Sequence, residues 1–278
     1  MRFPEELQVV GTTPPPPPPP SHWLRRLPEA AAVGIIAGGV LGSAYWASTR
    51  PDTSSHPDCP APPGLGMSFV KIEPGKFMMG SGSNQRAVTI TKPFCMSRFE
   101  ITQEQWQKIT DSLPSQRKEG KDFPVGNVSW YDVQKFLVLL NRRYSGARYR
   151  LPTEAQWEYA ARAGSSGNFH FEGEFDALPK YANCNRSREP AHVGSYRANP
   201  WGLYDMYGNI SEWVADWWAP LPDGAVTDPT GPAIGSKKVR RGGSFDYGAR
   251  CNSTFRIDMK PNIENDTVGF RVVRDPMK

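Results

Sequence analysis

Residues 201–218 read WGLYDMYGNISEWVADWW, a stretch that mixes tryptophan and tyrosine with glycine and carboxylates. Aromatic rings bring large areas to bury, whereas glycine admits backbone geometry that other side chains forbid. This mixture is typical of a tightly turned loop that its rings anchor to a core. Asp205 and Glu212 flank Gly208 and Asn209, so two carboxylates and several backbone oxygens would converge on one point. Hard cations such as Ca²⁺ use such oxygens, but the spacing is not that of an EF-hand, and a structural turn with solvated acids is the alternative.

The composition limits the class of protein. The chain has 278 residues, of which 38% are hydrophobic, with 28 Pro and 26 Gly, so we expect a core with many loops. The net charge of +5 is mild, and the basic residues at 237–241 fit the flank of a strand better than a nucleic-acid surface. No nucleic-acid partner is therefore expected. Zinc is not expected either. The chain has four cysteines, Cys59, Cys95, Cys184 and Cys251, and no two of them form a CxxC pair.

Residues 1–29 are predicted to be a disordered, proline-rich segment. They include seven consecutive prolines at 14–20, which favour an extended polyproline II spacer. A ligand for a proline-binding module is the alternative interpretation of the same run.

Residues 30–47, AAAVGIIAGGVLGSAYWA, contain no charged side chain and are predicted to form a transmembrane helix. At about 1.5 Å per residue the segment would span roughly 27 Å, close to the thickness of a bilayer core. Arg25 and Arg26 precede it and Tyr45 and Trp46 lie near its end, which places the N-terminus in the cytoplasm. The rest of the chain would then be extracytoplasmic, and periplasmic if the source is bacterial.

A cleaved signal peptide is the rival interpretation, because residues 42–44 read Gly-Ser-Ala. The preceding segment of 29 residues is long for a signal peptide, so we favour an uncleaved single-pass anchor. Gly34, Gly38 and Gly42 recur at every fourth position, a spacing that permits close helix pairing and hence a dimer.

A Pro- and Ser-rich linker is predicted over 48–66, followed by one domain over 67–274. Three helices are expected in it, each opened by a capping-box pattern at Thr102, Ser129 or Thr153, with Gly164 ending the last. Strands are predicted where apolar and polar residues alternate, at 67–80, 88–99, 239–245 and 268–273.

A set of motifs now occurs in order along the chain: MSFVKIEPGKFMMGS (67–81), VTITKPFCMSRFEIT (88–102), FPVGNVSWYDVQKF (123–136), YRLPTEAQWEYAARAG (149–164), NPWGLYDMYGNISEWVADWW (199–218), RRGGSF (240–245) and GFRVV (269–273). Together they resemble the formylglycine-generating enzyme (sulfatase-modifying factor) family over about residues 66–274. The resemblance implies an irregular α+β fold related to C-type lectins, with little regular secondary structure.

The resemblance also implies a structural Ca²⁺. Carried over by position, its ligands are the side chains of Asp205 and Glu212 and the carbonyl groups of Gly208 and Ile210. A second family calcium site begins at the position of Asn183. The remainder of that site falls in a segment shortened here to residues 185–196, so we do not expect the second site.

The resemblance departs at the catalytic centre. The family's oxidases bind Cu(I) with two cysteines after the GGS motif, and soft thiolates suit that ion. Here residues 245–261 read FDYGARCNSTFRIDMKP, so Tyr247 takes the place of the first cysteine and Cys251 lies out of register with the second. Copper is therefore not expected. Cys251 and Ser244, the serine of GGS, remain the candidate catalytic residues if the chain is an enzyme.

Two functional interpretations stay open. The first is a membrane-anchored binding, accessory or regulatory module that has a protein or peptide partner and no copper oxidase activity. The second is a divergent oxidase of the formylglycine-generating type that modifies a protein cysteine through Cys251. An iron-dependent variant of the second would need a cluster of histidines, and only His170 and His192 lie in the domain.

Overall fold

The computed structural model describes residues 54–118, 120–172, 174–184, 188–221, 223–246 and 250–277. The predicted disordered segment 1–29, the predicted helix 30–47 with its glycines, and Tyr247 lie outside these residues. The chain divides into two units, 1–49 and 50–278, and the fold below is that of the second. Among the residues described, no helix has the length and apolarity needed to cross a bilayer.

The strands of the described residues form three small sheets. The first has the order β1 (Phe69–Ile72), β4 (Phe94–Ser97), β11 (Val273–Arg274) and β5 (Tyr149–Arg150), with antiparallel neighbours. The second has the order β10 (Val268–Gly269), β6 (Ser211–Trp217), β8 (Lys238–Arg241) and β9 (Arg256–Met259), and only its β10–β6 pair is parallel. The third has the order β2 (Gly75–Met79), β3 (Arg86–Ile90) and β7 (Val226–Thr227).

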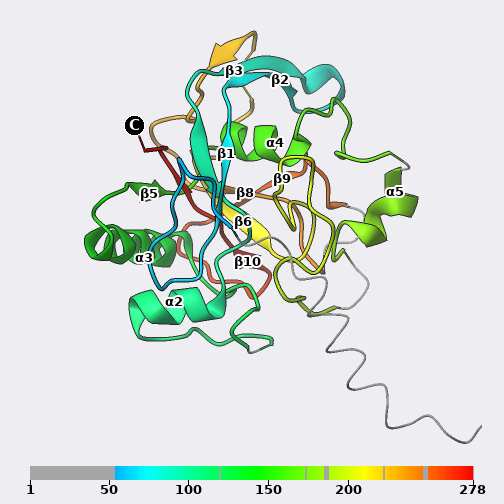
Figure 1. Ribbon diagram of the computed structural model, residues 1–278. Helices are drawn as coiled ribbons and strands as arrows, with labels where there is room; N and C mark the ends of the chain where they lie inside the picture. Colours follow the sequence, from blue (N-terminus) through cyan, green and yellow to red (C-terminus); the bar gives the residue numbers. More distant parts are fainter. Residues whose placement is uncertain are drawn as a thin grey trace, which may run out of the picture. The chain divides into compact units, whose positions relative to one another are not determined.

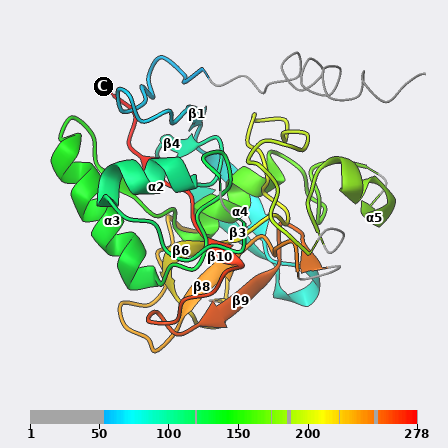
Figure 2. The ribbon, with the colours of Figure 1, turned by 90° about the horizontal axis from the view of Figure 1, so that it is seen from below.

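The predicted helices are α2 (Gln103–Thr110), α3 (Trp130–Arg143) and α4 (Glu154–Arg162), and each begins at its predicted cap. In every case the hydroxyl of the cap residue accepts from the backbone amide of the third helical residue. The side chain of that third residue accepts in turn from the backbone amide of the cap residue. Helices α2 and α3 lie side by side on one flank, and the short helix α5 (Glu174–Ala177) lies on the opposite flank (Figures 1 and 2). The other helical turns are of the 3₁₀ type, at Gly82–Asn84 and Leu178–Lys180.

The stretch 201–218 is a turn only in its first half. Residues 201–210 form the irregular part, whereas Ser211–Trp217 is β6, which pairs with β10 on one side and β8 on the other. The prediction of a loop over the whole stretch is wrong in this second half. Trp213 on β6 is fully buried, so this central strand carries one of the largest side chains of the core.

The C-terminal segment 268–273 forms two strands where one was predicted. β10 joins the sheet of β6, and β11 joins the sheet of β4. The residues between them link the two sheets, because the amide of Ile101 donates to Phe270 O and the amide of Ser97 donates to Val272 O, at 2.9 and 2.8 Å. The chain crosses from one sheet to the other at Arg271.

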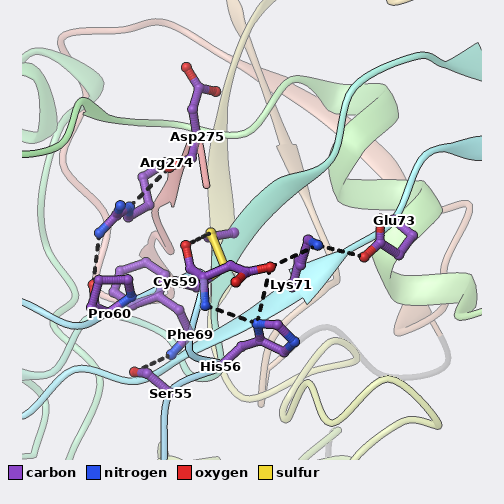
Figure 3. Close-up of a disulfide and its surroundings, with 11 residues drawn as sticks. Ser55, His56, Cys59, Pro60, Phe69, Lys71, Glu73, Arg274 and Asp275 are labelled. Atoms are coloured by element: carbon purple, nitrogen blue, oxygen red, sulfur yellow. Dashed lines mark hydrogen bonds and ion pairs between the residues drawn. A yellow bond between two sulfur atoms is a disulfide. The ribbon is translucent and has the colours of Figure 1, made fainter. Parts of the chain in front are cut away.

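Residues 54–66, the last part of the predicted linker, pack against the domain. Cys59 forms a disulfide with Cys95 of β4, and both cysteines are fully buried. Figure 3 shows the surroundings of this bond, where Lys71 of β1 pairs with Asp58 at 2.9 Å and Arg274 donates to Pro60 O at 2.8 Å. The start of the described chain is thus fastened to the first sheet.

Candidate functional site

A buried ion pair joins the tryptophan-rich stretch to the C-terminal segment. Glu212 on β6 accepts from Arg271, with Nη2–Oε1 and Nε–Oε2 distances of 2.7 Å. The indole Nε1 of Trp157 on α4 donates to the same carboxylate at 2.7 Å from Oε2. Both charged residues are at most 1% exposed. Each oxygen of Glu212 is therefore already bonded to a protein donor.

The remaining donors of Arg271 are also used. Its Nη2 donates to Tyr204 O at 2.9 Å, and its Nη1 lies 3.2 Å from Ser97 O. The guanidinium thus connects the first sheet, β6 and the turn that precedes β6. We infer that the pair is a structural link of the fold, since a buried charge requires such compensation.

A second pair of carboxyl groups, Asp205 and Glu100, lies close to this ion pair. Asp205 adopts the left-handed conformation, at φ 56°, and its Oδ2 accepts from the amide of Gly194 at 2.6 Å. Burial raises the pKa of Asp205 to about 6. Burial and then the charge of Asp205 raise the pKa of Glu100 well above its usual value. One oxygen of each carboxyl, Asp205 Oδ1 and Glu100 Oε2, is buried without a hydrogen-bond partner.

These contacts decide how well the predicted calcium ligands fit. Asp205 fits, because it has a buried oxygen without a partner. Glu212 does not fit as it stands, because Arg271 and Trp157 use both of its oxygens. Within the described ranges, no group of three or more His, Cys, Asp or Glu side chains is arranged to hold a metal ion. The Ca²⁺ at Asp205, Gly208, Ile210 and Glu212 stays a prediction.

Gly208 and Asn183 lie against each other and form an isolated parallel β-bridge. A Cβ on Gly208, whose φ is 77°, would lie 2.2 Å from Asn183 O, so only glycine permits this approach. The amide of Asn209 donates to the same carbonyl at 2.7 Å. Asn183, the predicted start of the second calcium site, therefore uses its backbone oxygen to hold the turn.

The candidate catalytic residues Cys251 and Ser244 lie side by side and are fully buried. The sulfur of Cys251 is 3.6 Å from Ser244 O, and it forms a disulfide with Cys184. Gly243 makes this approach sterically possible, because a Cβ there would lie 2.9 Å from the Cys251 sulfur. The structure thus brings the two predicted residues together, but it engages the Cys251 sulfur in a covalent bond.

The two histidines of the domain occupy different surroundings. His170 stacks on Tyr207 with a ring separation of 5.2 Å, and burial lowers its pKa to about 4. His192 stacks on Phe123 with a ring separation of 4.1 Å.

Sequence reasoning missed the partners of the site residues. Cys184, Glu100 and Arg271 were not assigned a role, and each meets its partner from a distant part of the chain. A signal was present for Arg271, because a single arginine inside the apolar motif GFRVV requires a buried acid. An even number of cysteines outside any metal motif was the corresponding signal for disulfides.

Comparison with known proteins adds to this geometry. The family model described as sulfatase-modifying factor enzyme 1-like domain matches residues 57–276. The formylglycine-generating enzyme of Streptomyces coelicolor is 34% identical over an alignment of 172 residues, and the match covers 55% of this chain and 52% of the enzyme. The serine/threonine-protein kinase Pkn1 of Chlamydia trachomatis is 31% identical over an alignment of 248 residues, and the match covers 74% of this chain and 38% of the kinase. The chain therefore spans about half or less of the length of these two relatives.

Among solved structures, the Treponema denticola variable protein 1 superposes with a TM-score of 0.70 and 25% sequence identity. The match covers 76% of this chain and 95% of that protein. Proteins with quite different names thus share this one domain.

Proposed function

The chain belongs to the family of sulfatase-modifying factor enzyme 1-like domains, and on this basis we propose that it is a binding or accessory module without copper oxidase activity. The observation that carries the proposal is the buried disulfide between Cys251 and Cys184. Thiolates hold Cu(I), and a disulfide sulfur has no thiolate to offer. The remaining cysteines, Cys59 and Cys95, are bonded to each other.

The relatives support a use of the domain outside oxidation. It is shared with a protein named as a kinase and one named as a variable protein, besides the named formylglycine-generating enzymes. A fold alone does not fix an activity. The proposal includes a protein or peptide as the partner that this domain binds.

The proposed location is outside the cytoplasm, tethered by a single-pass helix at 30–47, with pairing through Gly34, Gly38 and Gly42. Two disulfides among the described residues support it, because such bonds persist in oxidising compartments. The structural calcium ion implied by the family stays a prediction, because Arg271 and Trp157 occupy both oxygens of its ligand Glu212.

A divergent oxidase is the second candidate, and one observation favours it. The disulfide places two sulfur atoms together, so reduction of Cys184–Cys251 would release two adjacent thiols beside Ser244. Such a pair has the chemistry of a soft-metal site, although its positions differ from those of the family's copper cysteines.

One assay separates the two candidates. The purified full-length chain is loaded with Cu(I) and incubated in air with a Cys-x-Pro-x-Arg peptide, and the peptide mass is followed with and without prior reduction. We expect the cysteine mass to persist under both conditions. An aldehyde product that disappears in Cys251→Ser and in Cys184→Ser, but persists when Cys59 and Cys95 are both replaced by Ala, would establish the oxidase instead.

A further inference from the structure

A cavity of about 510 Å³ lies between the end of β6, the start of α4 and the segment that follows β7. Its size is that of a site for a small organic molecule. Its walls are mainly apolar and include Met79, Trp217, Pro220, Leu221 and Pro229. The residues of the candidate site above do not line it, so the cavity is a separate feature of the domain.

Two of the charged residues on its wall satisfy each other. Arg256 donates to Glu154 through Nε and Nη2, at 2.7 and 2.8 Å. Its Nη1 donates to Ala219 O at 2.9 Å, and its guanidinium lies 4.1 Å from the ring centroid of Trp218. This pair therefore has little hydrogen-bonding capacity left for a bound molecule.

Asp216 differs, because one of its oxygens remains available. Its Oδ2 accepts from the amide of Glu154, the first residue of α4, at 2.8 Å. Among the described residues no donor bonds to Oδ1. Gly231 approaches this oxygen so closely that a Cβ there would lie 3.1 Å from it, and both residues line the cavity. Asp216 Oδ1 is thus an acceptor at the wall of an apolar cavity.

The charges around Asp216 leave this carboxyl without a direct cationic partner. Lys238 of β8 is held between the rings of Trp130 and Trp217, at 4.1 and 3.7 Å, and its Nζ donates to Ala215 O at 2.7 Å. The neighbouring acid Glu154 is paired with Arg256. The other cation on the wall besides Arg256 is Arg86, which donates to Asn84 O at 2.6 Å. Burial, and after it the negative charge of Glu154, raise the pKa of Asp216 to about 7. The hydrogen bond from the Glu154 amide and the positive charges of Lys238 and Arg256 act in the opposite direction and lower this pKa.

The wall contributed by residues 226–227 and 229–232 is held in place by the strand pairing of β7 and by the hydrogen bonds of Asp228, which lies between these residues. β7 pairs with β3, and the amide of Asp228 donates to Thr89 O at 2.9 Å. Asp228 Oδ1 in turn accepts from the amide of Thr91 at 2.9 Å. A preformed cavity binds a ligand at a smaller entropic cost than one that must be ordered.

We propose that this cavity binds a small organic amine, whose ammonium group donates to Asp216 Oδ1 while its apolar part packs against Trp217 and the prolines. An ammonium–carboxylate hydrogen bond is charge-assisted and stronger than a neutral one. A neutral alcohol gains only the weaker bond, and a carboxylate would face Asp216 and Glu154. This binding site goes beyond the function proposed above and does not depend on it.

The test uses ligand-observed NMR on the full-length chain. It compares three probes that share a 2-phenylethyl group and differ in the polar group: 2-phenylethylamine, 2-phenylethanol and 3-phenylpropionate. We expect the amine to bind with a Kd of about 1 mM, as suits so small a ligand, and the other two to bind at least about tenfold more weakly. Because the amine requires the ionised carboxyl, its affinity should fall by about tenfold from pH 8 to pH 6.

Variants locate the binding. Asp216→Asn keeps an oxygen for the amide of Glu154 and should weaken amine binding by at least about tenfold. Leu221→Trp places a larger side chain on the cavity wall without changing the carboxyl and should abolish binding of the amine. Asp258→Asn on β9 makes the same chemical change outside the cavity and should leave the Kd unchanged.

Four outcomes would overturn the proposal: equal binding of amine and alcohol, tighter binding of the propionate, an unchanged Kd in Asp216→Asn, or no amine binding at about ten times the expected Kd. Tighter binding of the propionate would assign the cavity to an anion instead of an amine. The peptide-oxidation assay does not involve this cavity, so failure of either proposal is recognised separately.

Discussion

The guanidinium of Arg271 donates to both oxygens of Glu212, and the two residues lie 59 positions apart in the sequence. This buried contact joins the GFRVV motif to the tryptophan-rich stretch. Because Arg271 also donates to Tyr204 O and lies near Ser97 O, one side chain ties together the first sheet, the second sheet and the turn before β6.

Removing one member of the pair should destabilise the domain strongly. Glu212→Gln keeps an acceptor for the indole of Trp157 but leaves the charge of Arg271 buried and unpaired, which costs about 3 to 5 kcal/mol. Urea unfolding of the full-length chain measures this. The exposed pair Lys135–Asp132 on α3 supplies the control, since Lys135→Ala should change the free energy of unfolding by less than about 1 kcal/mol. Comparable losses in the two variants would remove Arg271–Glu212 from its structural role.

Chelation tests the calcium prediction directly. As the side chains stand, Glu212 has no oxygen free for a metal, so we expect the melting temperature to be the same with Ca²⁺ and with a chelator. A calcium ion present at a hundredfold excess over its Kd would contribute about 2.7 kcal/mol, and its removal would lower the melting temperature by about 5 to 10 °C. A fall of that size, absent in Glu212→Ala, would establish the calcium site and displace Arg271 as the partner of Glu212.

The local elements of the fold could be predicted because their determinants are local. The capping boxes at Thr102, Ser129 and Thr153 each lie within four residues, and all three helices begin where the pattern placed them. The family resemblance predicted the fold class, because each of its motifs is a short stretch of sequence and all of them occur in order along the chain. In contrast, 268–273 alternates like one strand but is divided between two sheets, and only the pairing with distant strands decides where it breaks.

The candidate site depended on long-range contacts and was predicted less well. Cys251 and Ser244 were identified as candidates, but no partner was predicted for Cys251. In the structure it forms a disulfide with Cys184, which lies 67 positions away in the sequence. No local pattern indicates which cysteines pair. Asp216 was equally hidden, because in the sequence it is only one acid in a run of tryptophans.

The disulfide at the start of the domain should stabilise it measurably. Cys59–Cys95 closes a loop across 36 positions, and its removal by replacing both cysteines with Ala should cost about 2 to 4 kcal/mol. The segment around Ser55 and His56 should also become more sensitive to protease, because the covalent attachment to β4 is lost. Urea unfolding and limited proteolysis of the full-length chain measure the two effects. Unchanged stability and an unchanged cleavage pattern would contradict this prediction.

The proposed topology predicts where a protease can act. If 30–47 is an uncleaved anchor with its N-terminus in the cytoplasm, then protease added outside intact spheroplasts should digest the domain. A tag at residue 1 should survive the same treatment. Digestion of the tag with survival of the domain would reverse the orientation, and a mature chain that begins after residue 44 would establish cleavage.

The last prediction concerns the pH dependence of stability through Asp216. Its pKa is raised by burial from 3.8 to about 7, so between pH 4 and pH 7 the folded chain binds more protons at this carboxyl than the unfolded chain does. Stability from this group is therefore fully present below pH 4 and is lost as the pH rises through about 7. Asp216→Asn cannot ionise and keeps the bond to the amide of Glu154.

We therefore expect wild type to lose stability relative to Asp216→Asn between pH 4 and pH 8, by an amount of order 2 to 4 kcal/mol. Urea unfolding of both proteins across this range gives the difference, in which contributions from Glu100 and other carboxyl groups cancel. Asp258→Asn, whose carboxylate pairs with Lys237, is the matched control and should show no such trend. A difference that stays constant with pH, or one that grows in favour of wild type, would show that Asp216 is ionised in the folded domain throughout the range.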